Sequence, residues 1–244
     1  MEQLIRVKYS KDAPIKYISH LNLTQVFTRA LRRAGIPMVI SGGFNPRFRI
    51  SFGPPLPLGI SSTSEYLDIR LKEEMNPEEL MNRLNKVLPQ GLKVVKAKII
   101  SLSSDSLVKV ISAVSYVITL KLKNGAFNLS KENLNIDEGD LKGLKEEIDK
   151  NIKGFLSPEE IVIEKQSKKG IKKINIRPVI LDMLVKEFKD QILEINLWLN
   201  IGQEGNLNPR YVVEAWLFNS GYNLDIKQIC RDGLYIKDQE VIDN

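Results

Sequence analysis

The chain has 244 residues, of which 43% are hydrophobic and 27% charged, the composition of a globular protein with one large domain or two of ordinary size. No apolar run approaches the roughly 18 residues that span a bilayer, and the first residues lack the basic and apolar regions of a secretory signal. The single cysteine, Cys230, excludes intrachain disulfides and any cysteine-rich metal or iron–sulfur site built from this chain alone. We therefore expect a cytoplasmic protein that does not associate with membranes.

Positive charge is concentrated at the N-terminal end. The chain has a formal net charge of +6, yet residues 1–50 hold nine Lys and Arg residues against two carboxylates, which is a net +7. The other 194 residues therefore carry about −1 in total. This asymmetry favours a local anionic partner, with nucleic acid as the leading candidate. A solvated basic surface without a partner is the alternative, and an acidic protein or a phosphorylated small molecule would also fit.

Residues 1–100 predict a ferredoxin-like (split βαβ) domain, in which an antiparallel sheet carries two helices on one face. The first helix follows the N-cap residue Ser19, has apolar side chains at helical spacing up to Ala34, and stops at Gly35. The second helix begins with the cap Asn76 and the first-position proline Pro77. The predicted strands of this domain cover residues 3–9, 37–40, 65–71 and 92–100.

A basic insertion at residues 41–63 is rich in glycine and proline, and we interpret it as a hairpin arm of this domain. Apolar and polar residues alternate along it, so that one side can be buried while the other presents two guanidinium groups. The apolar side holds Phe48, Ile50 and Phe52, and the polar side holds Arg47, Arg49 and Ser51. A plain hairpin with a proline-rich exit and a binding element are both compatible with this pattern.

The second half of the chain predicts a degenerate second ferredoxin-like domain at residues 113–244, after a linker at residues 101–112. The chain as a whole is thus expected to be an α+β protein with two tandem ferredoxin-like domains and antiparallel sheets. The tail should be irregular or weakly stranded. The predicted elements of this half are strands at 113–123 and 191–201, helices at 141–155 and 209–219, and a two-stranded arm at 160–165 and 171–178 that residues 179–185 continue or bend.

His20 is the only histidine, which excludes nucleophilic triads and two-histidine metal sites within one chain. A lone histidine in the first turn of a helix can still act as a general base or stack on a nucleobase, and the helix dipole favours its neutral form there. The alternative is a histidine that is hydrogen-bonded beside the helix cap. His20 is therefore the single candidate catalytic residue.

Arginines and phenylalanines of the arm form the main candidate binding cluster. Guanidinium groups grip phosphates in a bidentate way, and aromatic faces stack on bases. The alternative is that the phenylalanines belong to the core and the arginines are solvated. With the arginines on the outer or flanking face of the first helix, the candidate nucleic-acid-binding residues are Arg29, Arg32, Arg33, Phe44, Asn45, Arg47 and Arg49.

Other patterns give weaker signals. The turn at residues 202–206 holds two glycines before a proline-started helix, which can admit an anion, although a plain strand-to-helix turn explains it more simply. Glu65 and Asp68 are three residues apart on a strand and so point to opposite faces, which argues against a catalytic dyad. The residues indicate no metal site and no cofactor site.

Three runs carry a family resemblance: KYISHLNL at 16–23, RALRRAG at 29–35, and GFNP at 43–46 with RISFGPPLPLG at 49–59. In these the chain resembles the radical-SAM-linked proteins, a bacterial domain of unknown function found beside or fused to a radical SAM protein. The second half agrees more loosely, through Ile176-Arg177-Pro178 and the 202–205 run GQEG. The sequence departs from the family pattern where Asn22 replaces an aspartate and Arg47-Phe48 replaces a histidine-proline pair.

The resemblance implies a radical SAM protein as partner. The iron–sulfur cluster and S-adenosylmethionine would belong to that partner, because a chain with one cysteine cannot supply the three that the cluster takes. The two departures weaken the case for catalysis by this chain, since they remove polar residues that could act with His20.

Three functions remain open. The first is a non-enzymatic RNA-binding accessory protein that positions an RNA for modification by the radical SAM partner. The second is a metal-independent RNA-processing or RNA-modifying enzyme that uses His20. The third is a protein-interaction module in which the proline-rich loop docks the radical SAM partner without RNA. We favour the first, in which the isolated chain has no catalytic activity.

Overall fold

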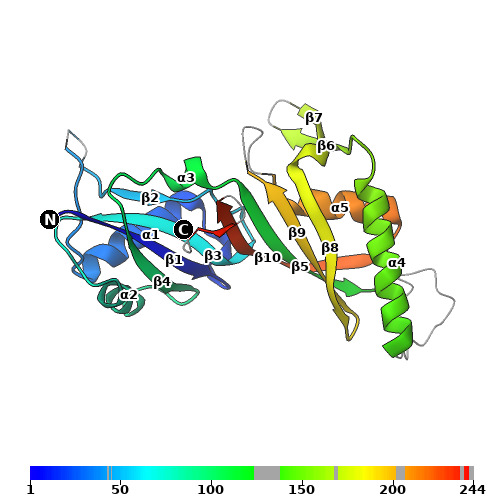
Figure 1. Cartoon of the computed structure of the whole chain (residues 1–244), viewed down its shortest axis with the longest axis horizontal. Helices are drawn as coiled ribbons and strands as arrows, with labels where there is room; N and C mark the ends of the chain where they lie inside the picture. The colour runs from blue at the N-terminus through cyan, green and yellow to red at the C-terminus, as the bar shows by residue number, and fades with distance from the viewer. Residues whose placement is uncertain are drawn as a thin grey trace. The chain divides into compact units, whose positions relative to one another are not determined.

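A computed structural model of the chain describes residues 1–42, 44, 46–123, 138–167, 170–201, 207–236 and 239–241 (Figure 1). The chain divides into two compact units, one formed by Met1–Ala113 with Arg231–Asn244 and the other by Val114–Cys230. The residues after Cys230, which the sequence placed in a second domain, thus group with the first unit. None of the described helices combines the length and hydropathy required to cross a bilayer.

Unit 1 is built on an antiparallel sheet in which the strand order is β4-β1-β3, with β2 and β10 also paired to β3. The mixed α+β content with antiparallel strands confirms the sequence expectation at that level. The elements of this unit are β1 (Gln3–Lys11), a 3₁₀ turn η1 (Ile15–Tyr17), α1 (His20–Arg33), β2 (Ile50–Phe52), β3 (Ser61–Leu71), α2 (Pro77–Asn85), β4 (Leu92–Ile100) and α3 (Leu107–Val110), joined by the end of β10 (Leu224–Ile236) and by β11 (Gln239–Glu240).

The core of unit 1 lies between one face of this sheet and the helices α1 and α2. Alternate residues of each strand point to that face, as the two-residue period of a strand requires. The cluster joins the strand residues Ile5, Val7, Tyr9, Leu67, Ile69, Leu71 and Val94 to the helix residues Leu23, Phe27, Ala30, Leu31, Leu80 and Leu84. The apolar stripe that predicted α1 is therefore the face that α1 buries.

Both ends of α1 form as the sequence predicts. Ser19 accepts a hydrogen bond from the backbone N–H of Asn22 at 3.2 Å and so satisfies one of the free N–H groups of the first turn. At the other end Gly35 takes a positive φ of 63°, and the N–H of Ile36 reaches back to the carbonyl of Leu31 at 3.1 Å. This is the Schellman arrangement, in which a glycine ends the helix without a steric penalty.

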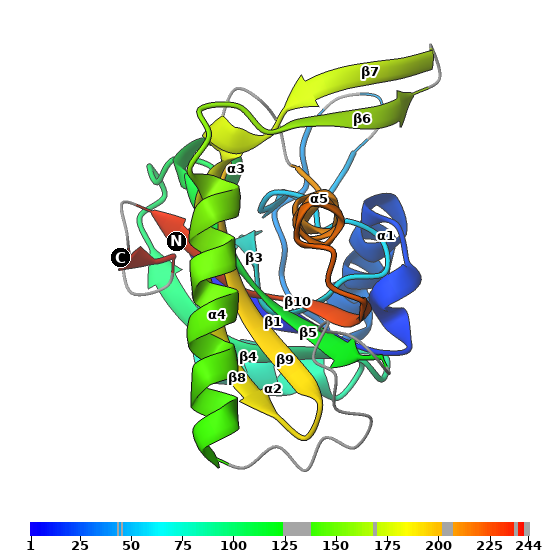
Figure 2. The ribbon, with the colours of Figure 1, turned by 90° about the vertical axis from the view of Figure 1, so that its right-hand side faces the viewer.

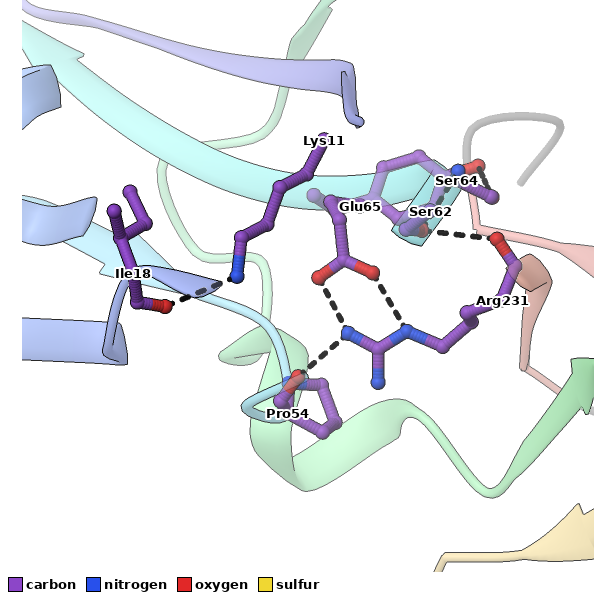
Figure 3. Close-up of polar contacts among 8 residues, drawn as sticks. Lys11, Ile18, Pro54, Ser62, Ser64, Glu65 and Arg231 are labelled. Atoms are coloured by element: carbon purple, nitrogen blue, oxygen red, sulfur yellow. Dashed lines mark hydrogen bonds and ion pairs between the residues drawn. The ribbon is translucent and has the colours of Figure 1, made fainter. Parts of the chain in front are cut away.

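Strand β3 is pinned on both faces by buried arginine–carboxylate pairs. Arg6 of β1 donates to both oxygens of Asp68 at 2.8 and 3.0 Å. Arg231 of β10, which is 0% exposed, donates from Nε and Nη2 to the two oxygens of Glu65, and its Nη2 also reaches the carbonyl of Pro54 at 3.0 Å (Figure 3). Because a bidentate pair fixes direction as well as distance, these contacts set the register of β3 against its neighbours.

The sheet of unit 2 has the strand order β10-β5-β9-β8, with β8 and β9 paired antiparallel, and β10 contributes its residues before Arg231. The helices α4 and α5 pack on it, and Trp216 of α5 donates from Nε1 to Asn151 of α4 at 2.8 Å. The elements are β5 (Ala113–Leu122), α4 (Glu138–Leu156), β6 (Val162–Ser167), β7 (Gly170–Asn175), a 3₁₀ turn η2 (Arg177–Val179), β8 (Ile180–Lys189), β9 (Ile192–Asn200) and α5 (Pro209–Ser220).

The structure corrects four details of the sequence interpretation. Residues 37–40 make only isolated bridges, from Met38 to Leu71 and from Ile40 to Phe48, because Pro37 has no N–H to donate. The expected linker contains α3, whose Leu107 is fully buried. Residues 180–189 form a strand paired to β9, so the two-stranded arm expected at 160–178 does not continue into them. The tail is not weakly stranded, since β10 is 13 residues long.

Removal of the Arg231 side chain tests the importance of the buried pair. In Arg231→Met the carboxylate of Glu65 stays buried without its cation, so we expect the free energy of unfolding to fall by about 3–5 kcal/mol. The double variant Arg231→Met/Glu65→Leu should recover much of this loss because neither partner of the pair is left as an unpaired buried charge. Urea denaturation followed by circular dichroism measures both. A single variant as stable as the wild type would contradict this assignment.

Candidate nucleic-acid interface

The C-terminal end of α1 meets the basic arm through a stacked pair of side chains. The guanidinium carbon of Arg32 lies 4.7 Å from the ring centroid of Phe48. Phe48 is half-buried and packs against the core, whereas Arg32 is exposed. Such cation–π contacts restrict the arginine without neutralising it. The phenylalanine thus belongs to the core and also orients a cationic group at the surface.

Residues 38–42 and 46–49 pair as a small hairpin, and from here on we call residues 38–49 the arm. The N–H of Ser41 donates to the carbonyl of Arg47 at 2.8 Å, and the N–H of Arg47 donates to the hydroxyl of Ser41 at 3.0 Å. The arm is tied to the sheet where the N–H of Arg70 in β3 donates to the carbonyl of Arg49 at 3.1 Å. These bonds hold the backbone, while the side chains of Arg47 and Arg49 are exposed as the alternation predicts.

Phe44 lies at the tip of the arm with its side chain fully in solvent, at a relative exposure of 107%. Full exposure of a phenylalanine forgoes roughly 1.5–3 kcal/mol of burial. The alternative that the arm's phenylalanines are all core residues is therefore wrong for Phe44. Its neighbour Asn45, also a candidate contact, lies outside the described residues.

The other two arginines of α1 differ in role. Arg33 is exposed but donates from Nη2 to the carbonyl of Val87 at 2.8 Å, so it also links the end of α1 to the end of α2. Arg29 is exposed one turn earlier on the same helix as Arg33. Cations in the last turn of a helix are favoured by its dipole. Arg32, Arg33, Arg47 and Arg49 are thus the exposed arginines at the end of α1 and on the arm, and we call them the basic cluster.

His20 is not part of this cluster. It lies at the opposite end of α1, about 18 Å from Arg32 along the helix axis at 1.5 Å per residue. Its exposed ring packs edge-to-face on Phe52, with the centroids 5.4 Å apart. Exposed apolar side chains of Tyr17 and Leu21 lie next to it in sequence. The histidine is therefore held at the beginning of α1 by an aromatic contact, apart from the arginines.

The sequence interpretation missed a buried polar cluster next to η1, which consists of Tyr9, Lys11, Glu65 and Arg231. Lys11 is only 2% exposed and donates from Nζ to the carbonyl of Ile18 at 3.1 Å (Figure 3). Burial lowers the pKa of Lys11, the carboxylate of Glu65 raises it, and the guanidinium of Arg231 lowers it. Its position could have been predicted, because Lys11 continues the odd-numbered, core-facing side of β1.

Two of the cations at the N-terminal end do not lie at the surface. Lys11 and Arg6 are two of the nine cations counted at the N-terminal end, and both are buried. Arg6 is neutralised by Asp68, and Lys11 satisfies a backbone carbonyl. The cationic surface of residues 1–50 is thus smaller than the count indicates. Its exposed arginines are those of α1 and the arm.

The remaining candidate sites involve other residues. Two cavities, of about 460 and 440 Å³, are lined by residues of unit 2. Among the residues that the structure describes, no three His, Cys, Asp or Glu side chains gather into a possible metal site. The glycine-containing turn at 202–206 lies outside the described residues.

Tyr9 gives the cluster a measurable pH dependence. Burial and the nearby carboxylate of Glu65 raise the pKa of Tyr9 well above 10.0, although Arg231 lowers it somewhat. Above pH 10 the unfolded chain ionises this phenol while the folded chain keeps it neutral, so the folded state binds more protons and stability falls as pH rises. The lowered pKa of Lys11 acts in the opposite direction below about pH 10.5.

Tyr9→Phe isolates this effect. We expect the stability of the wild type relative to the variant to decline above pH 10 by up to about 1.4 kcal/mol per pH unit. Urea denaturation of both proteins at pH 8, 9, 10 and 11 measures the difference. A difference that does not change with pH would show that Tyr9 titrates alike in the folded and unfolded chains.

Solved structures with a similar course of the chain come from H/ACA ribonucleoprotein complexes. They are a Cbf5-Nop10-Gar1 complex (9% identity, 97% of this chain, TM-score 0.47), an archaeal box H/ACA sRNP Nop10-Cbf5 complex (10%, 94%, 0.41) and an H/ACA RNP bound to a substrate RNA (9%, 97%, 0.45). The chain spans about half of each matched chain, at 50%, 46% and 49%. At these scores the likeness decides nothing about what this chain binds.

A search of curated proteins finds no significant match. A family model does match, over residues 4–209, which is most of the chain. That span includes α1, the arm and β3, and therefore every residue of the basic cluster described above. The chain belongs to the family described as uncharacterized protein conserved in bacteria (DUF2344).

Proposed function

We propose that this chain is an RNA-binding accessory protein that holds an RNA substrate for a radical SAM enzyme. The observation that carries the proposal is the arm, which presents a fully exposed Phe44 at its tip and the exposed Arg47 and Arg49, and on whose Phe48 Arg32 is stacked. A protein gains nothing in its own stability from an exposed phenylalanine among arginines. A ligand that has both phosphates and aromatic bases can use both kinds of side chain.

The arrangement favours single-stranded RNA over a duplex. Bases of a single strand are open to stacking, whereas those of a duplex stack on one another. Guanidinium groups beside the aromatic ring can grip the phosphates on either side of a stacked base. The arm is held by backbone hydrogen bonds at Ser41, Arg49 and Arg70, so little ordering is required on binding.

The fold we infer for both units is ferredoxin-like. In unit 1 the elements follow the order β1-α1-β2-β3-α2-β4, with strands arranged β4-β1-β3-β2. In unit 2 the order β5-α4-β8-β9-α5-β10, with strands arranged β10-β5-β9-β8, repeats that plan, and the β6–β7 hairpin is inserted into it. A fold of this kind does not fix a function, so the proposal depends on the arm.

The radical SAM partner is supported by the motif resemblance in residues 16–59. The iron–sulfur cluster and S-adenosylmethionine are assigned to that partner, because this chain has one cysteine. Within this account His20 does not catalyse. It stands about 18 Å along α1 from the arginine cluster and packs on Phe52.

RNA titrations at several salt concentrations test the binding. In Arg47→Ala/Arg49→Ala two phosphate contacts are lost, so the slope of log K against log salt for a single-stranded RNA should become shallower by about 1.4. Phe44→Ala should weaken binding by roughly 1–3 kcal/mol and leave the slope unchanged, because stacking releases no counterions. Filter binding measures both.

The matched control removes two exposed cations, Arg83 of α2 and Lys86 at its C-terminal cap, and should leave the slope near the wild-type value. No retention of RNA by the wild type at low salt would refute RNA binding. Equal slopes for the arm variant and the control would show that the arm does not contact phosphates.

Co-purification tests the partner. From cells that express the tagged chain and the radical SAM protein together, we expect the two to purify as a complex that also contains RNA. Nuclease treatment should remove the RNA, and high salt should weaken its retention. A complex that forms equally well without RNA, with no RNA bound at any salt concentration, would instead support a pure protein-docking role.

A further inference from the structure

The β6–β7 hairpin forms a two-stranded sheet of its own within unit 2. Its two strands pair only with each other among the described residues, and Figure 2 shows them as a separate two-stranded ribbon. The base of the ribbon is fixed, because the N–H of Ile176 donates to the carbonyl of Ile161 at 2.8 Å and that of Ile161 to the side chain of Asn175 at 3.0 Å. Beyond this base the strands have no partner sheet, a marginal arrangement in water.

Lysines dominate the exposed part of this ribbon. Lys165 lies directly opposite Lys172 in the strand register, and both are exposed. Like charges in directly opposed positions destabilise a strand pair. Among the described residues of β6 and β7 the one carboxylate is that of Glu164, which faces Lys173 on the other side of the ribbon at 4.0 Å. The ribbon thus keeps a cationic pair that weakens it as a free element.

An aromatic side chain accompanies the lysine pair. The Nζ of Lys165 lies 5.6 Å from the ring centroid of Tyr211, in the first turn of α5. A cation held over an aromatic ring keeps its charge. Ile171, on the opposite side of the ribbon, is 68% exposed. The hairpin is therefore a basic element with open apolar surface and no partner strand among the described residues.

We propose that the β6–β7 hairpin is a second RNA-binding element, which grips phosphates through Lys165, Lys172 and Lys173. The inference rests on the proposed function, since it assigns the same ligand class to a second place in the chain. A phosphate between Lys165 and Lys172 would convert their repulsion into two attractive contacts, which is the charge complementarity that selects a polyanion. Lysine ammonium groups act here as point charges, so the hairpin adds affinity and contributes little sequence preference.

The sequence count of charge hides this element. Residues after position 50 sum to about −1, because acidic residues elsewhere offset the lysines of the hairpin. The three described lysines fall within 9 residues of each other, from Lys165 to Lys173. The net charge of a short stretch of residues would have shown this lysine cluster, which the net charge of all residues after position 50 conceals.

The test is a salt titration of Lys165→Gln/Lys172→Gln/Lys173→Gln with the same single-stranded RNA. Loss of three phosphate contacts should make the slope of log K against log salt shallower by about 2. The control variant Lys121→Gln/Lys150→Gln/Lys153→Gln removes the same charge from exposed positions of β5 and α4 and should keep the wild-type slope. The arginine variant Lys165→Arg/Lys172→Arg/Lys173→Arg should also keep it, because the charge is preserved.

The outcomes separate this inference from the proposed function. If the wild type binds RNA and the arm variant has a shallower slope, but the glutamine hairpin variant matches the wild type, the hairpin inference is overturned and the arm account stands. If the wild type binds no RNA at low salt, both fall. A hairpin variant that changes capture of an acidic protein and not the RNA slope would also overturn the inference. Melting curves of all variants exclude unfolding as the cause.

Discussion

Buried arginine–carboxylate pairs on strand β3 are the constraint on which the first unit depends. Asp68 holds Arg6 on one face of the strand, and Glu65 holds Arg231 on the other. A charge of this kind is costly to bury alone and tolerable only with a partner in good geometry. Because successive residues of a strand point to opposite faces, a slip of β3 by one residue would separate both carboxylates from their arginines. The pairs therefore specify one register.

The register of β3 in turn places the candidate interface. Strand β2 pairs with β3 from Leu67 to Ile69, and the carbonyl of Arg49 accepts a hydrogen bond from Arg70. The arm leads directly into β2, and its Phe48 packs between the core and Arg32 of α1. The exposed groups that we assign to RNA are thus carried by a backbone that buried contacts fix. Preorganisation of this kind reduces the entropy lost on binding.

Local signals in the sequence predict much of this arrangement. The stripe and caps of α1 give its bounds closely, and the alternation of residues 47–52 gives the exposed arginines. The sequence could not show that Arg231 enters the first unit, because its partner Glu65 is 166 residues away and no periodicity connects them. The same long-range pairing explains why β10 looked like an irregular tail: its buried polar residue interrupts the apolar pattern.

The net charge of residues 1–50 overstates the cationic surface at this end of the chain. It includes Arg6 and Lys11, which are buried and stabilise the fold. Function in this chain is thus better inferred from which cations remain at the surface, and beside which aromatic rings, than from their number.

The most direct measurement is ultraviolet crosslinking of the full chain to a single-stranded RNA, followed by mass spectrometry of the adducts. The account predicts crosslinked peptides that contain Phe44 and the rest of the arm, because a base stacked on that ring lies in contact with it. Efficient crosslinking that is confined to peptides outside the arm, or none under conditions of low salt, would contradict the assignment of this surface to RNA.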